Sequence, residues 1–207
     1  MADTSGTNWS GSEGEEPVDT NAEIMWAVYR ALSKNGYPEL TMSQIAAEFE
    51  KSKGLLYYHY DSKEAILNDF FTHLCERLET SLVDDEYDDP AEQLWAVIER
   101  ILPAAMDDEQ LEFRQAFFEA RSQAPHNRSY HEQIRRSDHI IIETLEETIA
   151  WGVDTGQFTD VSPEDHAELL FSLLYGCLER GTALEDQDLI DRNRQLIEAH
   201  IERTLLE

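Results

Sequence analysis

The stretch MSQIAAEFEKSKGLLYYHYDSKEAIL, residues 42–67, decides the fold, and it also holds most of the lysine in the chain. Three tyrosines and a histidine occupy positions 57–60, and Lys51, Lys53 and Lys63 lie around them. Only four lysines occur in 207 residues, whose formal net charge is −28. Keeping lysines beside a polar-aromatic cluster in so acidic a chain indicates a surface with a particular task.

The negative charge is unevenly distributed along the sequence. Residues 1–20 carry five acidic and no basic residues, residues 21–68 sum to −1, and residues 69–207 sum to −22. We interpret the total as adaptation to very high cytoplasmic salt in an extreme halophile, because at about 1 M salt the Debye length is about 3 Å and self-repulsion is screened. The alternative is an acidic protein that repels nucleic acid.

No apolar run is long enough for a transmembrane helix, which needs about 18 residues. The first twenty residues lack the basic start and apolar middle of a signal peptide, and we interpret them as a disordered acidic tail of a cytoplasmic protein. Cys75 and Cys177 lie in apolar helical patterns, where they are expected to be small buried side chains.

Apolar spacing predicts that the ordered chain begins with three helices. An amphipathic helix is expected over residues 21–34 and a short helix over 42–49. A tight turn at residues 50–51 leads into a second short helix from Ser52, and a long helix begins near Lys63. Two short helices joined by a tight turn and packed on a preceding helix make a helix-turn-helix.

Capping and breaking residues mark the ends of these helices. Gly36 is expected just after the first helix, with Pro38 beyond it. Thr41 or Ser43 caps the second helix. The rest of the chain is also helical, without a convincing strand, so we predict an all-α protein of about nine or ten helices. The later helices are expected after the cap Asp89, over DDEQLEFRQAFFEARSQA, over 127–152, over 163–184 after the cap Ser162, and over 188–205.

The second helix of a helix-turn-helix offers its outward face to the major groove of DNA. Leu56 and Tyr60 point to the core, which leaves an outward set with an unusual chemistry. Tyrosine hydroxyls and histidine donate to phosphate oxygens, rings pack on sugars and thymine methyls, and ammonium groups meet phosphates. The outward set is Lys53, Gly54, Leu55, Tyr57, Tyr58 and His59.

From Thr41 to Leu67 the sequence resembles the TetR family of transcriptional repressors. The matching positions are Thr41, Ile45-Ala46, Ser52-Lys53-Gly54, Leu55, Leu56, Tyr57, Tyr60 and Lys63-Glu64-Ala65-Ile66-Leu67. The resemblance implies that Lys53, Tyr57, His59 and Lys63 hold the DNA backbone, that Gly54, Leu55 and Tyr58 face bases, and that Thr41 meets a phosphate.

Two positions depart from the family pattern. The family usually has glycine in the turn, at positive φ, where this chain has Glu50; a side chain there costs about 1 kcal/mol. The next position is usually apolar and is Lys51 here, so the turn is expected to be reshaped, with Lys51 offsetting Glu50. Leu55 stands where many members have threonine, and it offers apolar contact without a hydrogen bond.

The resemblance also implies a domain organisation and two partners beyond DNA. Residues 21–68 would be the DNA-binding domain and residues 69–207 a ligand-binding and dimerisation domain. The helices near 163–184 and 188–205 would form a four-helix bundle with a second copy. The alternative is that these helices only fill the core of a monomer.

An unidentified small-molecule effector, hydrophobic or amphipathic, is expected from the family. Its candidate contacts are the large side chains Trp95, Met106, Phe113, Phe117, Phe118, Trp151 and Tyr175, and plain core packing is the alternative for each. His126, Arg128 and His131 are solvated surface in our interpretation, with contact to a polar ligand head as the alternative.

Rival functions find less support in the residues. We expect no enzyme, cofactor or metal site, since the chain has no phosphate-binding loop, dinucleotide glycine pattern or His-Glu-x-x-His motif. None of its seven histidines has a glutamate three residues before it, as a di-iron bundle requires. A helical protein-interaction module whose helix-turn-helix no longer binds DNA stays as the alternative, and Glu50 and the net charge favour it.

Overall fold

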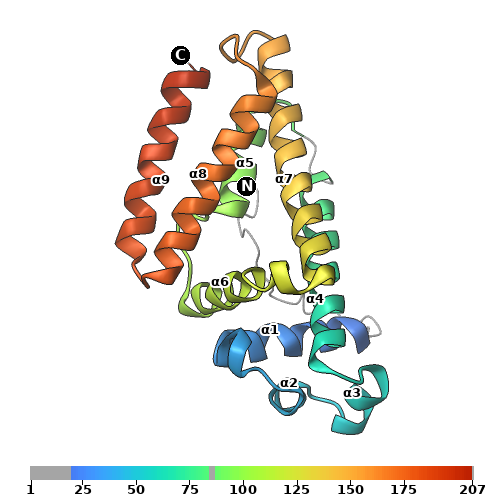
Figure 1. Cartoon of the computed structure of the whole chain (residues 1–207). Coiled ribbons are helices and arrows are strands. Elements are labelled where there is room, and N and C mark those ends of the chain that lie inside the picture. Colours follow the sequence, from blue (N-terminus) through green and yellow to red (C-terminus); the bar gives the residue numbers. More distant parts are fainter. Residues whose placement is uncertain (1–19, 84–86, 207) are drawn as a thin grey trace. The chain divides into compact units, whose positions relative to one another are not determined.

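The computed structural model describes residues 20–83 and 87–206, and within them the chain is helical throughout (Figure 1). All but the last residue of the acidic tail predicted for 1–20 lies outside the described residues. The helices are α1 (Thr20–Glu39), α2 (Met42–Glu48), α3 (Lys53–His59), α4 (Lys63–Val83), α5 (Pro90–Ile101), α6 (Asp108–Arg121), α7 (Arg128–Asp154), α8 (Pro163–Ala183) and α9 (Gln187–Ile201). A 3₁₀ turn, Ala124–His126, precedes α7, and a π-helical turn, Glu202–Leu206, follows α9.

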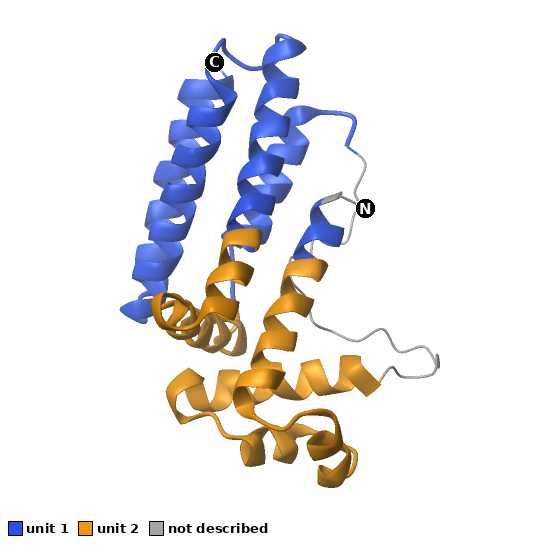
Figure 2. Ribbon diagram, turned by 45° about the vertical axis from the view of Figure 1, so that its right-hand side comes forward, with its two compact units in different colours: residues 1–8, 78–106, 137–207 blue, residues 9–77, 107–136 orange. Residues whose placement is uncertain are grey.

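Packing divides the described residues into two compact units, coloured in Figure 2. Unit 2 takes residues 20–77 and 107–136, and unit 1 takes 78–83, 87–106 and 137–206. The helices α4 and α7 each contribute to both units. The boundary predicted between residues 68 and 69 separates a DNA-binding domain from a ligand-binding and dimerisation domain. This division by function stays a prediction.

The first helix is longer than the sequence pattern predicted. Two helical segments of α1 meet at Gly36, whose φ is 69°, a conformation that a residue with a Cβ adopts at a cost. The expected break at Gly36 is therefore present, but the chain resumes a helical path to Glu39. The backbone N–H of Tyr37, just after the break, donates to Glu119 Oε2 of α6 at 2.9 Å. This long-range partner, which local sequence does not reveal, satisfies a group that the kink frees.

The core of unit 2 forms where α1 packs on α6 and α2, and α2 packs on α3. Tyr60, which was predicted to point to the core, is half-buried, and the buried residues of this core are hydrophobic. They include Ile24, Val28, Leu32, Ile45, Phe49, Leu56, Ile66 and Phe70, each at most 5% exposed. Cys75 and Cys177 are buried, as expected, and are not joined in a disulfide; they lie in units 2 and 1 respectively.

In unit 1, caps fix the starts of three helices, and two of these helices cross closely. Asp89 caps α5, Ser162 caps α8 and Asp186 caps α9 through bonds to backbone N–H groups. The α8–α9 crossing is tight at Gly181, where an added Cβ would lie 2.1 Å from Ile190 Cγ1. Glycine is needed there for space, and the two helices can bury their apolar faces against each other.

The last helix was expected to run to residue 205, but its final turn is π-helical. The N–H of Thr159 donates to the Leu205 carbonyl at 2.9 Å, and its hydroxyl donates to the Thr204 carbonyl at 2.5 Å. These donors, which come from the segment before α8, bind carbonyls that a helix end leaves open. Among the described residues, no helix combines the length and apolar character needed to cross a membrane.

Candidate nucleic-acid interface

The two short helices of unit 2 are capped as the sequence indicated. Thr41 is the N-cap of α2, and its hydroxyl oxygen accepts from the Gln44 N–H at 3.3 Å and donates to Gln44 Oε1 at 2.6 Å. Ser52 caps α3, with its hydroxyl accepting from the Leu55 N–H at 3.3 Å. Both caps lie immediately before their helices, so local sequence is enough to fix where α2 and α3 begin.

The turn between α2 and α3 is reshaped, and the strain expected at Glu50 does not arise. Among the described residues other than glycine, positive φ occurs at Glu185 and not at Glu50. Lys51 does not pair with Glu50 as expected: its Nζ lies 2.6 Å from Glu23 Oε2 and 3.3 Å from Thr20 Oγ1. Lys51 therefore joins the turn to the start of α1, and Glu50 stays exposed.

The outward face of α3 carries large aromatic side chains in solvent. Tyr57 is 42% exposed and Tyr58 is 83% exposed, and both are large side chains. Lys53, Gly54 and His59 are exposed on the same helix. Leu55, in contrast, is half-buried, because part of its side chain packs against the core of unit 2. The predicted recognition residues thus form one surface, with Leu55 at its inner edge.

The four lysines fall into two groups by the partners of their ammonium groups. Lys34 Nζ lies 2.8 Å from Glu48 Oε2, and Lys51 pairs with Glu23 as above. Lys53 Nζ lies 5.5 Å from the centroid of the Tyr57 ring and 3.3 Å from Ser43 Oγ. Lys63 Nζ lies 5.1 Å from the centroid of the Tyr37 ring and 3.4 Å from the Tyr37 carbonyl oxygen.

This division has an electrostatic consequence. Within the described residues, Lys53 and Lys63 have no carboxylate partner, so a tyrosine ring attracts each charge without neutralising it. Lys34 and Lys51 are largely neutralised by their own carboxylates. The structure therefore separates the lysines into two that form ion pairs within unit 2 and two whose charge no described carboxylate neutralises.

The residues that brace α3 were not among those predicted from the sequence. The Tyr60 hydroxyl, just after α3, donates to Asp69 Oδ2 on α4 and lies 3.4 Å from Asn21 Oδ1. Burial, together with this bond to Asp69, raises the pKa of the Tyr60 hydroxyl, which remains a donor at neutral pH. Arg30 of α1 donates to the Glu48 carbonyl at 2.7 Å and fixes the end of α2. Tyr60 lies just before the start of α4 and Asp69 in its second turn. This short separation is the feature of the sequence from which the bond between them could have been predicted.

The seven predicted ligand contacts are divided between the two units. Phe113, Phe117 and Phe118 of α6 lie in unit 2, and Phe113 and Phe117 pack against its core. Unit 1 holds Trp95, Met106, Trp151 and Tyr175, all half-buried. Their role as a pocket lining stays a prediction. His126, Arg128 and His131 are exposed, as the solvated-surface interpretation predicts.

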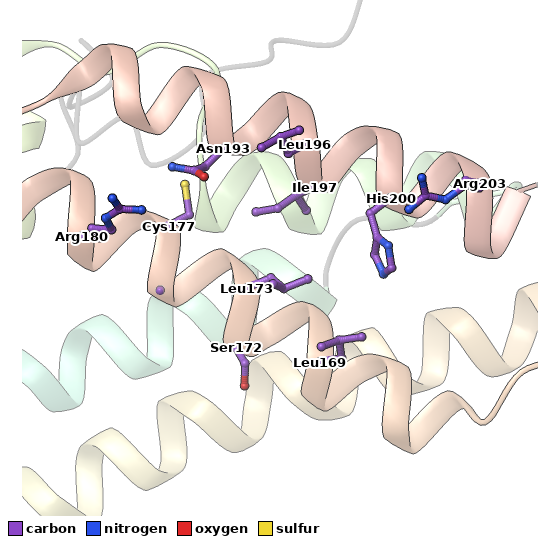
Figure 3. A pocket seen from close by; sticks show the side chains of 11 residues that line it. Leu169, Ser172, Leu173, Cys177, Arg180, Asn193, Leu196, Ile197, His200 and Arg203 are labelled. Atoms are coloured by element: carbon purple, nitrogen blue, oxygen red, sulfur yellow. The ribbon is translucent and has the colours of Figure 1, made fainter.

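A second exposed surface lies on unit 1, in a groove of about 600 Å³ between α8 and α9. Figure 3 shows the leucines of α8 on one side and side chains of α9 on the other. Among the described residues, no aspartate or glutamate lines this groove. Its lining is Leu169, Ser172, Leu173, Gly176, Cys177, Arg180, Asn193, Leu196, Ile197, His200 and Arg203.

Comparison with known families matches both parts of the chain. A family model described as bacterial regulatory proteins of the tetR family matches residues 24–70. A second model, described as the C-terminal part of BetI-type transcriptional repressors, matches residues 90–206. No curated protein matches the chain.

Solved structures resemble the chain over most of its length. A TetR transcription regulator from Haloarcula marismortui ATCC 43049 is 33% identical, with a TM-score of 0.81, and the match covers 90% of this chain and 98% of that one. A transcriptional regulator from Saccharomonospora viridis, in complex with choline, is 19% identical with a TM-score of 0.77, covering 90% and 97%. SmeT, in complex with triclosan, is 17% identical with a TM-score of 0.70, covering 91% and 92%. The last two identities are low, and they show the fold alone.

Proposed function

The chain belongs to the TetR family of transcriptional regulators, and on that premise we propose that it is a dimeric repressor that binds an operator in double-stranded DNA. A small hydrophobic or amphipathic ligand releases it from the operator. In this proposal residues 21–68 bind DNA, and residues 69–207 bind the ligand and a second copy.

The exposed face of α3 carries the DNA-binding proposal. Tyr57 and Tyr58 are exposed beside Lys53, whose charge no described carboxylate neutralises. Aromatic rings and hydroxyls in that position fit the sugars, thymine methyls and phosphates of a major groove. Thr41, His59 and Lys63 add phosphate contacts, and Gly54 and Leu55 approach the bases with Tyr58.

The α8–α9 groove supports the dimer. Leu169, Leu173 and Leu196 are 44%, 37% and 63% exposed in a single chain. Beyond its chain neighbours and the nearby backbone of α8, no described atom lies within 4 Å of a Cβ added at Gly176, so a helix from another chain can approach it closely. An isologous interface over this groove would bury the three leucines and keep carboxylates away from its centre.

Ligand release is proposed as a population shift between two spacings of the paired recognition helices. Only a spacing of about 34–36 Å lets both helices enter successive major grooves. The helix α4 begins at Lys63, beside the DNA-binding residues, and continues into unit 1 from Leu78 onward. A tilt of this helix would alter the spacing. Relatives of the same fold in complex with choline and with triclosan support a small-molecule effector.

The salt environment follows from the charge. We place the protein in the cytoplasm of an extreme halophile, as its net charge of −28 and its likeness to the Haloarcula marismortui regulator support. Counterion release weakens as salt rises, with a slope near −0.9 per phosphate contact. DNA affinity at molar salt then rests on hydrogen bonds, apolar contacts and shape, which the tyrosines supply.

The test is DNA binding by the full-length dimer in fluorescence anisotropy, from about 0.2 to 3 M KCl. The probe is the duplex upstream of the protein's own gene, with random DNA as competitor. Specific binding that persists at molar salt is expected. Tyr58→Ala should abolish the preference for the probe without affecting folding, since Tyr58 is 83% exposed.

Leu184→Ala is the matched control, because it truncates another large side chain, 61% exposed, in unit 1. A bound duplex also provides a ligand screen by release. If the protein binds no duplex, including any selected from a random pool, the interaction-module alternative replaces this proposal.

A further inference from the structure

The side chain of Lys63 is held in an unusual way at the first residue of α4. Its ammonium group lies 5.1 Å from the centroid of the Tyr37 ring and 3.4 Å from the Tyr37 carbonyl oxygen. Both partners are on one residue of α1, located 26 positions earlier in the chain. A lysine has a flexible four-carbon stem with many rotamers, so two contacts on one residue restrict it to a small region.

Tyr37 is itself fixed from two further elements of unit 2. Its backbone N–H donates to Glu119 Oε2 of α6 at 2.9 Å. Its ring meets the ring of Tyr130, in the first turn of α7, edge to face at a centroid distance of 6.1 Å. Tyr130 is 1% exposed and cannot move aside without disturbing the core. The ring beneath Lys63 is therefore a rigid platform.

The chemistry of the platform differs from that of an ion pair. A carboxylate would neutralise the lysine, as Glu48 does for Lys34 at 2.8 Å and Glu23 for Lys51 at 2.6 Å. An aromatic face attracts the cation and leaves its charge uncompensated. The N–H donors that do not point to the ring or carbonyl remain available to an anion.

From this geometry we infer that Tyr37 is a positioning residue for DNA binding: it holds the Lys63 ammonium ready for a phosphate, so that less side-chain freedom is lost when the complex forms. This inference rests on the proposed function, because it assumes that Lys63 meets the DNA backbone. It assigns a role to Tyr37, which lies outside the helix-turn-helix pattern. A phosphate contact made by a pre-organised side chain binds more tightly than one made by a free side chain.

The experiment measures the affinity of the full-length protein for a duplex selected by the wild-type protein from a random pool, across a series of KCl concentrations. Lys63→Ala should reduce the magnitude of the slope of log K against log salt by about 0.9, as expected for one lost phosphate contact. Tyr37→Leu should weaken binding by about 3-fold to 10-fold. It should also reduce the slope, by less than Lys63→Ala does, because an unrestrained Lys63 makes the phosphate contact in only part of the bound molecules. The double variant should bind no more weakly than Lys63→Ala alone.

The slope separates positioning from a merely structural role, since a lower fraction of folded protein shifts the affinity and leaves the slope unchanged. Tyr37→Phe keeps the ring and should keep the wild-type slope. A trifluorinated phenylalanine at position 37 has nearly the same shape but a weaker negative face, and it should reproduce Tyr37→Leu. This variant replaces Tyr37→Leu if the leucine variant does not fold.

Two results overturn the inference while leaving the proposed function in place. One is a wild-type slope in both Tyr37→Leu and the fluorinated variant. The other is tighter binding on loss of the ring, because Tyr37 would then withhold Lys63 from DNA. A wild-type protein that binds no duplex overturns the proposed function, and the inference falls with it.

Discussion

Two surfaces of this chain expose large side chains, and both avoid acidic residues although the protein carries 44 of them. The α3 helix in unit 2 presents Tyr57 and Tyr58 with a lysine. The groove between α8 and α9 in unit 1 presents three leucines with two arginines and a histidine. We propose that a partner approaches each of these two surfaces, and the side chains on each surface indicate which partner fits.

The two surfaces differ in their large exposed side chains, which are tyrosines with lysine on α3 and leucines in the groove. Tyrosine and lysine donate hydrogen bonds and meet a polyanion, whereas leucines gain free energy only by leaving water. We therefore expect substitutions in the groove to act on association between copies, and substitutions on α3 to act on DNA.

A carboxylate in the groove should produce the largest effect. Leu173→Asp would place a charge in the centre of the proposed interface, at a cost of about 3 kcal/mol or more, which is about a hundredfold in the dimer dissociation constant. Sedimentation equilibrium should show a monomer. Leu184→Asp, outside the groove lining, is the control and should stay dimeric. A dimer that survives Leu173→Asp unchanged would place the interface elsewhere.

The close crossing that supports the groove should be the next most sensitive feature. Gly181→Ala would bring a methyl group to 2.1 Å from Ile190 Cγ1, which is buried. Overpacking of this kind lowers the free energy of unfolding by about 1–3 kcal/mol. Urea denaturation followed by circular dichroism measures it.

Gly176→Ala is the matched comparison on the same helix, because beyond the nearby backbone of α8 no described atom lies within 4 Å of the added methyl. In a monomeric Leu173→Asp background it should raise the free energy of unfolding by about 0.5–1 kcal/mol through helix propensity. In the wild-type background it should weaken the dimer. Equal destabilisation by both glycine substitutions would contradict the crossing geometry.

On the other surface, the lysines should behave as two classes. Lys53→Ala is expected to weaken DNA binding about tenfold at low salt and to reduce the salt slope by about 0.9. Lys34→Ala removes the same charge from the same unit but breaks the contact to Glu48 instead. It should leave the salt slope unchanged. Anisotropy titrations across KCl concentrations decide this, and a changed slope in both variants would mean that Lys34 also meets DNA.

The smallest expected effect concerns the reshaped turn. Because Glu50 is not at positive φ, Glu50→Gly relieves no strain and should be about 0.5 kcal/mol less stable than Glu50→Ala through chain entropy. A left-handed residue there would make the glycine variant the more stable one by about 1 kcal/mol. Thermal and urea denaturation of the two variants measure which of them has the larger free energy of unfolding.

Sequence by itself determined the features that depend on neighbours in the chain. Capping bonds are made by Thr41, one of two candidates, by Asp89 and Ser162, which were predicted as caps, and by Ser52, where a helix was predicted to start. Helical spacing likewise placed Leu56 inside and Tyr58 outside. The all-helical class, the helix-turn-helix and the outward face of α3 follow from such short-range relations, because capping and periodicity act within one or two turns.

Tertiary structure alone decided which partner each charged or aromatic residue has. Lys51 forms an ion pair with Glu23 and not with the expected Glu50, and the Lys63 ammonium lies over the Tyr37 ring. Both partners are in α1, which packing brings beside the later helices of unit 2. The division of the seven candidate ligand contacts between two units and the tight fit of Gly181 on Ile190 have the same origin. Contacts between distant positions depend on how amphipathic helices pack, and the side-chain pattern of one helix does not specify which face of another it will meet.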